Sequence, residues 1–314
     1  MSAPASDAAG CRPATLAMPS SFYRGGLWRA ALALARILPR PLLQTLCLAA
    51  AELYYALHSR RRAIVTANLR PVLKDDPSAA SRAAHRLFRQ FALKLAELWR
   101  FESGIAADSL FTGGVDWAIF EQARARGQGV LLVTPHLGNW ELGGVLLARR
   151  GVKLLVLTQA EPGAGFTQMR MSSRSRWGIE TLVVGGNGFD FVEIIRRLQD
   201  GANVALLIDR PPVAKAVTIE LFGRPFAASI AAAELARASG CALLGVTVLR
   251  AGNGYRANIL PEFHYDRASL GDREARRQLT QQVLRAFEPA IRDHPDQWFH
   301  FVPVWSQSPP VGLG

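Results

Sequence analysis

The sequence predicts an α/β fold in which a mostly parallel central sheet is flanked by helices. From residue 127 onward, short apolar runs of strand length alternate with segments of helical periodicity, which is typical of a parallel sheet. Before this region, residues 78–101 carry apolar side chains at helical spacing and predict a long helix. The chain has 314 residues, 49% of them hydrophobic and 20% charged, which is enough for a sizeable core and excludes a disordered or collagen-like protein.

The elements of the alternating region follow from local patterns. Residues 130–133 form a continuous apolar run, as expected of a strand buried on both faces. A hairpin is expected over 217–226, turning around Phe222-Gly223-Arg224-Pro225. Further strands are expected at 154–157, 181–184, 204–208, 242–249 and 255–260, and helices at 139–150, 166–177, 189–198, 230–239 and 272–291. Active sites of such sheets lie at the carboxyl ends of the strands.

Residues 21–62 combine apolar helices with basic charge. They contain seven arginines and a single acid, Glu52. A helix is expected over 27–38, and the stretch 41–59 approaches the ~20 residues of a spanning helix. Because Glu52 would cost a few kcal/mol inside a bilayer, we expect these helices to lie in the interface, with arginines 60–62 on anionic head groups. The alternative is a pair of helices packed on the protein's own core.

Charge and cysteine content narrow the function classes. The chain carries 37 basic and 25 acidic residues, a net charge of +12, which favours an anionic partner: nucleic acid, a membrane surface or a phosphorylated substrate. Three cysteines far apart indicate free thiols in a reducing compartment.

We expect a disordered N-terminus at 1–20, membrane-associated helices at 21–62, one α/β domain at 63–306 and a tail at 307–314.

The most informative motif follows the first strand of the sheet. The run Thr134-Pro135-His136-Leu137-Gly138-Asn139-Trp140-Glu141 places a histidine at a strand end, a turn at Gly138 and Asn139, and an acid in the first turn of a helix. If His136 stands just before that helix, Glu141 can accept a hydrogen bond from one ring nitrogen and leave the other as a base. This is the orienting half of a catalytic triad without its nucleophile, which the substrate would then supply as a hydroxyl. A strand-end histidine beside an acid is, however, more often structural than catalytic.

Other chemistries receive little support from the sequence. No Gly-x-Ser-x-Gly or His-Glu-x-x-His motif is present. A metal site of His136, Glu141 and Asp209 is an alternative use of the same residues. A thioesterase could use the same pair of residues to activate water. A nucleic-acid-binding protein is motivated only by the net charge, because no basic-aromatic module accompanies it.

The motif resembles a known family. Residues 135–141 are similar to the His-x4-Asp/Glu box of the lysophospholipid acyltransferase superfamily, in the branch that holds lipid A (lauroyl or myristoyl) acyltransferases and phosphatidylinositol mannoside acyltransferases. The resemblance covers roughly residues 22–305. It includes the segments 61–69 and 221–225, an arginine at Arg174 and an aspartate at the strand end, Asp209. The C-terminal segment 297–305 lacks the arginines of lipid A enzymes and looks more like the mannoside branch, and residues 227–229 also depart from the pattern.

The resemblance implies a reaction and a set of site residues. It implies transfer of a fatty acyl chain from acyl carrier protein or coenzyme A to a hydroxyl of a glycolipid or phospholipid, at the cytoplasmic face of a bacterial inner membrane, without a cofactor or metal. His136 would be the general base, and Glu141 would fix its tautomer. The tetrahedral oxyanion would be bound by backbone N–H groups of the turn at Gly138 and Asn139. Further substrate-binding roles are implied for Arg174, Arg176, Arg210 and Asp209: the first two would bind phosphate, Arg210 would bind phosphate or pair with Asp209, and Asp209 would orient an arginine.

Overall fold

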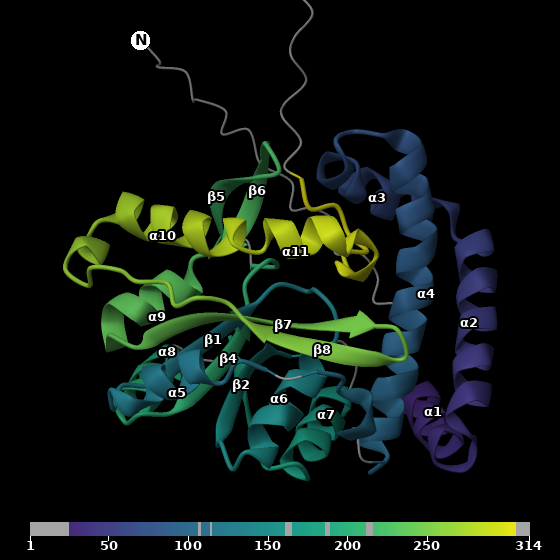
Figure 1. The fold of residues 1–314 in the computed structure, drawn as a ribbon, viewed down its shortest axis with the longest axis horizontal. Coiled ribbons are helices and arrows are strands. Elements are labelled where there is room, and N and C mark those ends of the chain that lie inside the picture. The colour runs from purple at the N-terminus through teal and green to yellow at the C-terminus, as the bar shows by residue number, and fades with distance from the viewer. Residues whose placement is uncertain are drawn as a thin grey trace, which may run out of the picture.

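A computed structural model describes residues 25–105, 108–113, 115–160, 165–185, 189–211 and 216–305. The segments expected to be a disordered N-terminus (1–20) and a tail (307–314) lie outside the described residues. Within the described residues, the expected α/β architecture is confirmed: a central sheet is covered by helices on both faces, and a further layer of helices stands at one end (Figure 1).

The main sheet has six strands in the order β3-β2-β4-β1-β7-β8. Its strands are β1 (Val130–Thr134), β2 (Leu154–Gln159), β3 (Ile179–Val184), β4 (Asn203–Leu207), β7 (Ala242–Ala251) and β8 (Gly254–Ile259). All neighbouring pairs are parallel except β7 with β8. The hairpin expected at 217–226 is a separate antiparallel pair, β5 (Ala216–Leu221) and β6 (Arg224–Ser229). Since β1 lies beside β4, residues that follow these two strands meet at one edge of the sheet.

Alternation along β1 explains the two covered faces. Leu131 and Val133 point into one core with helices α8 (Asp190–Gln199), α9 (Ala231–Ser239) and α10 (Arg273–Arg285). Val130 and Leu132 point into the opposite core with helices α5 (Ala118–Ala125) and α6 (Trp140–Arg149). Successive side chains of a strand leave opposite faces, so a strand apolar at every position requires helices on both. Helix α7 (Phe166–Ser175) lies beside α6 (Figure 1).

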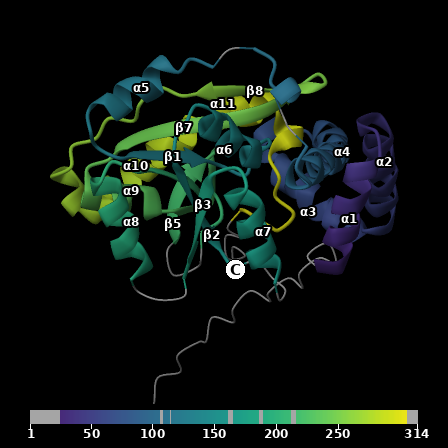
Figure 2. The ribbon, with the colours of Figure 1, turned by 90° about the horizontal axis from the view of Figure 1, so that it is seen from below.

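The N-terminal helices form a layer next to the carboxyl ends of the parallel strands. This layer holds α1 (Gly25–Ile37), α2 (Arg40–Leu57), α3 (Ser59–Leu69) and the long α4 (Pro77–Glu102). The side chain of Asp76, the residue before α4, caps the N-terminus of that helix. Figures 1 and 2 both show these helices gathered at one end of the sheet, where the arrow of β7 points toward α4. Among the described residues no helix is both long and apolar enough to cross a bilayer.

The structure differs from the sequence-based expectation for one helix. The helix expected over 272–291 is divided into α10 and α11 (Glu288–Asp293), because Pro289 occupies the start of α11 and has no N–H to continue the first helix. Glu52 of α2 pairs with His85 and Arg89 of α4, so the side of α2 that carries it is directed toward the protein. The short 3₁₀ turns are η2 (Pro71–Leu73), η3 (Asp108–Leu110), η5 (Ser269–Gly271) and η6 (Pro295–Gln297).

Candidate active site

His136 lies two residues beyond the end of β1, in a loop whose backbone is hydrogen-bonded to distant parts of the chain. Its backbone carbonyl accepts a hydrogen bond from the N–H of Phe299 (2.8 Å), and the next turn is closed by Gly138. Gly138 has a φ of +65°, and a Cβ there would lie 2.1 Å from the carbonyl oxygen of Val248. Only glycine fits this conformation and this contact. The chain therefore makes a tight turn at Gly138, and the His136 imidazole lies at the carboxyl edge of the sheet.

Asp209 is the partner of the His136 ring. It follows β4, the parallel neighbour of β1, and its Oδ1 accepts a hydrogen bond from His136 Nδ1 at 2.6 Å. Its Oδ2 accepts from the His136 backbone N–H (2.8 Å), from Trp298 Nε1 (3.1 Å) and from His300 Nε2 (2.7 Å). With only 1% of its side chain exposed, Asp209 is held by four donors. This arrangement fixes the tautomer that leaves His136 Nε2 without a proton.

The surroundings keep the His136 ring neutral and Asp209 ionised. Burial lowers the pKa of His136 from 6.5 to about 4, although the nearby Asp209 carboxylate opposes this. Burial alone would raise the pKa of Asp209, but the two histidines and their hydrogen bonds hold it well below its usual range. At neutral pH the site therefore presents an unprotonated imidazole nitrogen backed by a carboxylate.

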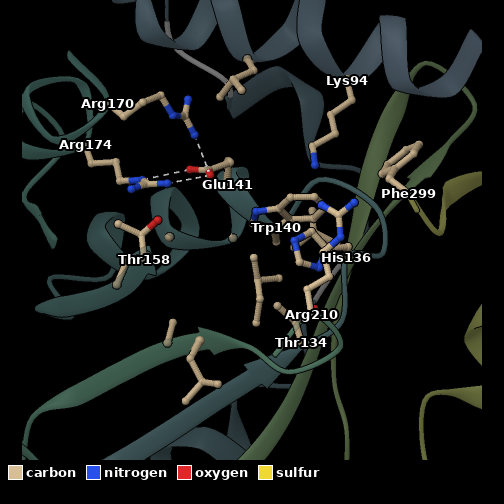
Figure 3. Close-up of a pocket in the computed structure, with 18 of the residues that line it drawn as sticks. Lys94, Thr134, His136, Trp140, Glu141, Thr158, Arg170, Arg174, Arg210 and Phe299 are labelled. Carbon is tan, nitrogen blue, oxygen red and sulfur yellow. Dashed lines mark hydrogen bonds and ion pairs between the residues drawn. The ribbon is translucent and has the colours of Figure 1, made fainter. Parts of the chain in front are cut away.

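The expectation that Glu141 orients His136 is wrong in this structure. Glu141 lies in the first turn of α6, as expected, but it is held by two arginines of α7: Arg174 donates through Nε (3.1 Å) and Nη2 (2.8 Å), and Arg170 Nη2 lies 2.6 Å away (Figure 3). Burial raises the pKa of Glu141, but these arginines together hold it below its ordinary value. Glu141 is a buried anion that fixes α7 against α6.

The arginines expected to bind phosphate differ in their availability. Arg174 is 8% exposed, and its guanidinium group makes a bidentate contact with Glu141, so its predicted role in binding phosphate is not supported. Arg176 is exposed and donates to the backbone carbonyl of Glu102. Arg210 is exposed and lines the cavity, and no ion pair with Asp209 is found among the described residues. Asp209 orients histidines, not an arginine as expected.

The turn after His136 does not offer the expected oxyanion donors. The N–H of Gly138 donates to the carbonyl of Gln297 (2.9 Å), and the N–H of Asn139 donates to the carbonyl of Val248 (2.7 Å). Asn139 is fully buried, and its side-chain amide donates to the hydroxyl of Tyr255. Both residues therefore shape the loop, and neither N–H is directed at a substrate.

Comparison with known proteins shows the family of this chain. Residues 15–307 match the family described as bacterial lipid A biosynthesis acyltransferases. The chain belongs to this family. Phosphatidylinositol mannoside acyltransferases are among its relatives: a Mycobacterium tuberculosis protein is 30% identical over 62% of this chain and 59% of its own length, and a Mycolicibacterium smegmatis protein is 27% identical over 74% and 73%. The chain thus spans less than two thirds of the length of the first relative.

In this lipid A acyltransferase family member, a cavity of about 1870 Å³ reaches from the N-terminal helices to His136. Its lining is mainly apolar and includes Trp28, Leu98, Phe166 and Leu207, while His136, Asp209 and Arg210 lie at its polar end. Figure 3 shows Glu141 between Arg170 and Arg174 on one wall, and Lys94 reaching in from α4 toward Trp140 and His136.

Sequence reasoning missed four residues of this site. Arg170 pairs with Glu141 and Glu102, and Trp298 and His300 bind Asp209 from a segment about 160 residues further along the chain than His136. The sequence marks Trp298 and His300 through the resemblance of segment 297–305 to the family's C-terminal block, but it does not connect them with Asp209. Lys94 did leave a signal: it is one of four lysines, and it lies on the apolar face of its helix, three residues after Phe91 and four before Leu98.

The possibility of a metal centers on the same residues. Among the described side chains, His136, Asp209 and His300 offer ligand atoms that all lie within 4.8 Å of one another. Glu141, which the sequence-based alternative included, is not part of this group. The Asp209 oxygens lie 2.6 Å from His136 Nδ1 and 2.7 Å from His300 Nε2, which are the distances of direct hydrogen bonds between the carboxylate and the two rings. The group fits a hydrogen-bonded acid–base cluster better than a set of metal ligands.

Proposed function

We propose that the protein is a membrane-associated O-acyltransferase, which moves a fatty acyl chain from a thioester of acyl carrier protein or coenzyme A to a hydroxyl of a glycolipid or phospholipid. The observation that carries the proposal is the bond between His136 Nδ1 and Asp209, which leaves His136 Nε2 as a base facing an apolar cavity. Family membership and the mannoside acyltransferase relatives support the same chemistry.

Among the described residues, no serine, threonine or cysteine is hydrogen-bonded to His136, so the site supplies a base and the acceptor would supply the nucleophile. His136 Nε2 would take the proton of the acceptor hydroxyl as its oxygen attacks the thioester carbonyl carbon, and would return that proton to the leaving thiolate. Asp209 would stabilise the imidazolium formed between these two transfers without taking its proton. No acyl-enzyme is required. Transfer to water, the thioesterase alternative, would use the same atoms with a water molecule as acceptor.

The cavity suits an acyl chain and a lipid acceptor. Its apolar lining would bury methylenes, each worth about 0.8 kcal/mol. Leu27, Leu34 and Leu46 of α1 and α2 line the cavity and are also exposed, so it opens at the surface of the N-terminal helices. Arg210, which is exposed and also lines the cavity, would contact a phosphate of the acceptor or donor.

The exposed faces of α1 and α2 support contact with a membrane surface. Leu42, Leu46, Leu53 and Leu57 follow one another at helical spacing along α2, and each is 47% or more exposed. Exposed Arg29, Arg36 and Arg60 on the same layer of helices would face anionic head groups. Such a surface would place the cavity opening against lipid. The cytoplasmic face of a bacterial inner membrane is the location that fits a thioester donor.

The test is His136→Ala in the full-length chain. The purified protein is given acyl-acyl carrier protein or acyl-coenzyme A with a phosphatidylinositol mannoside or a lipid A precursor in detergent, and acylated lipid is measured by mass spectrometry. We expect His136→Ala to lose roughly 10²–10⁴-fold in turnover while its binding to vesicles stays unchanged. The control is His264→Ala, since His264 is exposed after β8. Near-normal turnover of His136→Ala would exclude the mechanism.

A further inference from the structure

Lys94 carries a buried amino group in the wall of the cavity. It lies in the middle of α4 and is only 4% exposed, yet it belongs to the cavity lining. Its Nζ lies 2.7 Å from the centre of the Trp140 ring and 5.1 Å from that of Phe299. The same Trp140 ring is in edge-to-face contact with His136, at 5.0 Å between ring centres. The amino group and the base therefore lie against one indole ring (Figure 3).

No carboxylate in the described part of the chain pairs with Lys94. Among the described residues, Nζ has no hydrogen bond and no ion pair, and the nearby anions are taken: Glu141 is bound by Arg170 and Arg174, and Glu102 by Arg170 and Trp28. Burial lowers the pKa of Lys94 well below 10.5, and Glu141 offsets this only in part. Burying an amino group that has no hydrogen-bond partner is costly, whether or not it is charged. A fold that keeps one here retains a hydrogen-bond donor that no protein group uses.

The proposed reaction needs such a donor. As the acceptor oxygen adds to the thioester, the carbonyl oxygen becomes an oxyanion that has to be bound by preorganised donors. The N–H groups of Gly138 and Asn139 are engaged in the backbone and leave this role unfilled.

We propose that Lys94 Nζ donates a hydrogen bond to the thioester carbonyl oxygen and stabilises the oxyanion of the tetrahedral intermediate. This inference rests on the proposed acyl transfer. The acceptor hydroxyl gives its proton to His136 Nε2 and forms the new C–O bond, while the carbonyl π electrons move to the oxygen held by Lys94. When they return, the C–S bond breaks, and the thiolate takes the proton from His136.

An oxyanion fits the surroundings of Lys94 better than a phosphate does. A phosphate dianion would have to lose its hydration between two aromatic rings, beside a side chain that is 4% exposed. A thioester is uncharged when it enters and acquires charge only as the reaction proceeds. The contact with Lys94 is therefore strongest in the transition state, and its loss should lower kcat more than it raises KM.

The experiment compares Lys94→Met with Lys94→Gln in the full-length chain, using the thioester and lipid assay described above. Both replacements remove the amino group and have similar length, but only glutamine can donate a hydrogen bond. We expect Lys94→Met to lower kcat roughly 10²–10³-fold with KM for both substrates within about threefold. Lys94→Gln should retain at least ten times more activity than Lys94→Met.

The melting temperature separates this role from a structural one. Replacing an unpaired buried amino group by methionine should leave the melting temperature unchanged or raise it. Lys153→Met is the matched control, because Lys153 is exposed just before β2, at the opposite end of the parallel strands. Equal activity of Lys94→Met and Lys94→Gln, or a loss confined to KM, would overturn the role of Lys94 alone. A wild-type chain that transfers no acyl group to any acceptor would overturn both the proposed function and this inference.

Discussion

His136 carries its ring into a site that solvent reaches poorly, and this sets the pH range in which it can act. Its side chain is 13% exposed, and burial lowers its pKa from 6.5 to about 4. A general base works in its unprotonated form, so activity is present above this pKa and lost as the pH falls through it. We therefore expect the acid limb of kcat/KM for acyl transfer to have its midpoint near pH 4, not near 6.5. Initial rates over the range in which circular dichroism shows a folded chain give this midpoint.

The Asp209→Asn variant is the companion to that measurement. An asparagine can donate through its amide and favours the wrong tautomer of His136, so turnover should fall about 10³–10⁴-fold. Because the carboxylate also raises the pKa of His136, any residual activity should not show an acid limb shifted upward. A variant with near-normal turnover, or an acid limb that moves toward pH 6.5, would contradict the role of Asp209.

Sequence reasoning reached His136 but assigned it the wrong partner. The motif placed a histidine, a turn and an acid within six residues, and proximity in the chain favoured Glu141. The choice is made by strand order: β4 lies between β2 and β1, which brings Asp209 to His136 across 73 positions. Periodicity predicts strands, but it says nothing of which strands become neighbours. The same reason hid Trp298 and His300, which reach the site through a returning C-terminal segment.

Helix α4 shows what an element's own pattern can reveal. Its apolar spacing predicted the helix almost to its observed ends, and the structure extends it only from 78–101 to Pro77–Glu102. The same pattern marks Lys94 and Glu97 as exceptions on buried positions, and Glu97 is paired with Arg40 of α2. A charged residue on an apolar helix face is therefore the signal to follow, because burial of a charge needs a partner or a function.

Helix α2 has one apolar face that is buried and one that is exposed. Leu43 and Ala51 are buried, whereas Leu42, Leu53 and Leu57 are exposed. We expect the variant Leu42→Ser, Leu53→Ser, Leu57→Ser to bind anionic phospholipid vesicles roughly 10- to 100-fold more weakly, because less apolar surface enters the interface. Vesicle co-sedimentation measures this.

The matched control for the α2 variant is Phe189→Ser, Val192→Ser. These residues are also exposed, at 78% and 61%, but they lie just before and within α8, at the other end of the molecule from α2 (Figure 1). The control should bind vesicles like the wild type. Unchanged binding of the α2 variant, or an equal loss in the control, would contradict the assignment of the membrane surface to α2.

At the scale of the whole molecule, the site is assembled where two layers meet. The sheet layer supplies His136 and Asp209, and α6 and α7 supply Glu141 and its arginines. The helical layer contributes Lys94 and also Glu102, which binds Trp28 of α1 (2.8 Å) and Arg170 of α7. The N-terminal helices are therefore part of the cavity wall as well as an apolar surface.

This double role predicts the outcome of removing the N-terminal helices. Deleting residues 1–57 would take away Trp28, Leu43 and the partner of Glu97, Arg40. Burial of a leucine such as Leu43 contributes about 1.5–3 kcal/mol, and the apolar face of α4 would be left open. We expect a chain that aggregates or melts at least 10 °C lower, with no acyl transfer even to acceptor in detergent. The serine variant of α2 should instead melt within a few degrees of the wild type and keep its turnover in detergent. Thermal melting, size-exclusion chromatography and the detergent assay report these outcomes, and a soluble, active truncated chain would show that α1 and α2 serve the membrane alone.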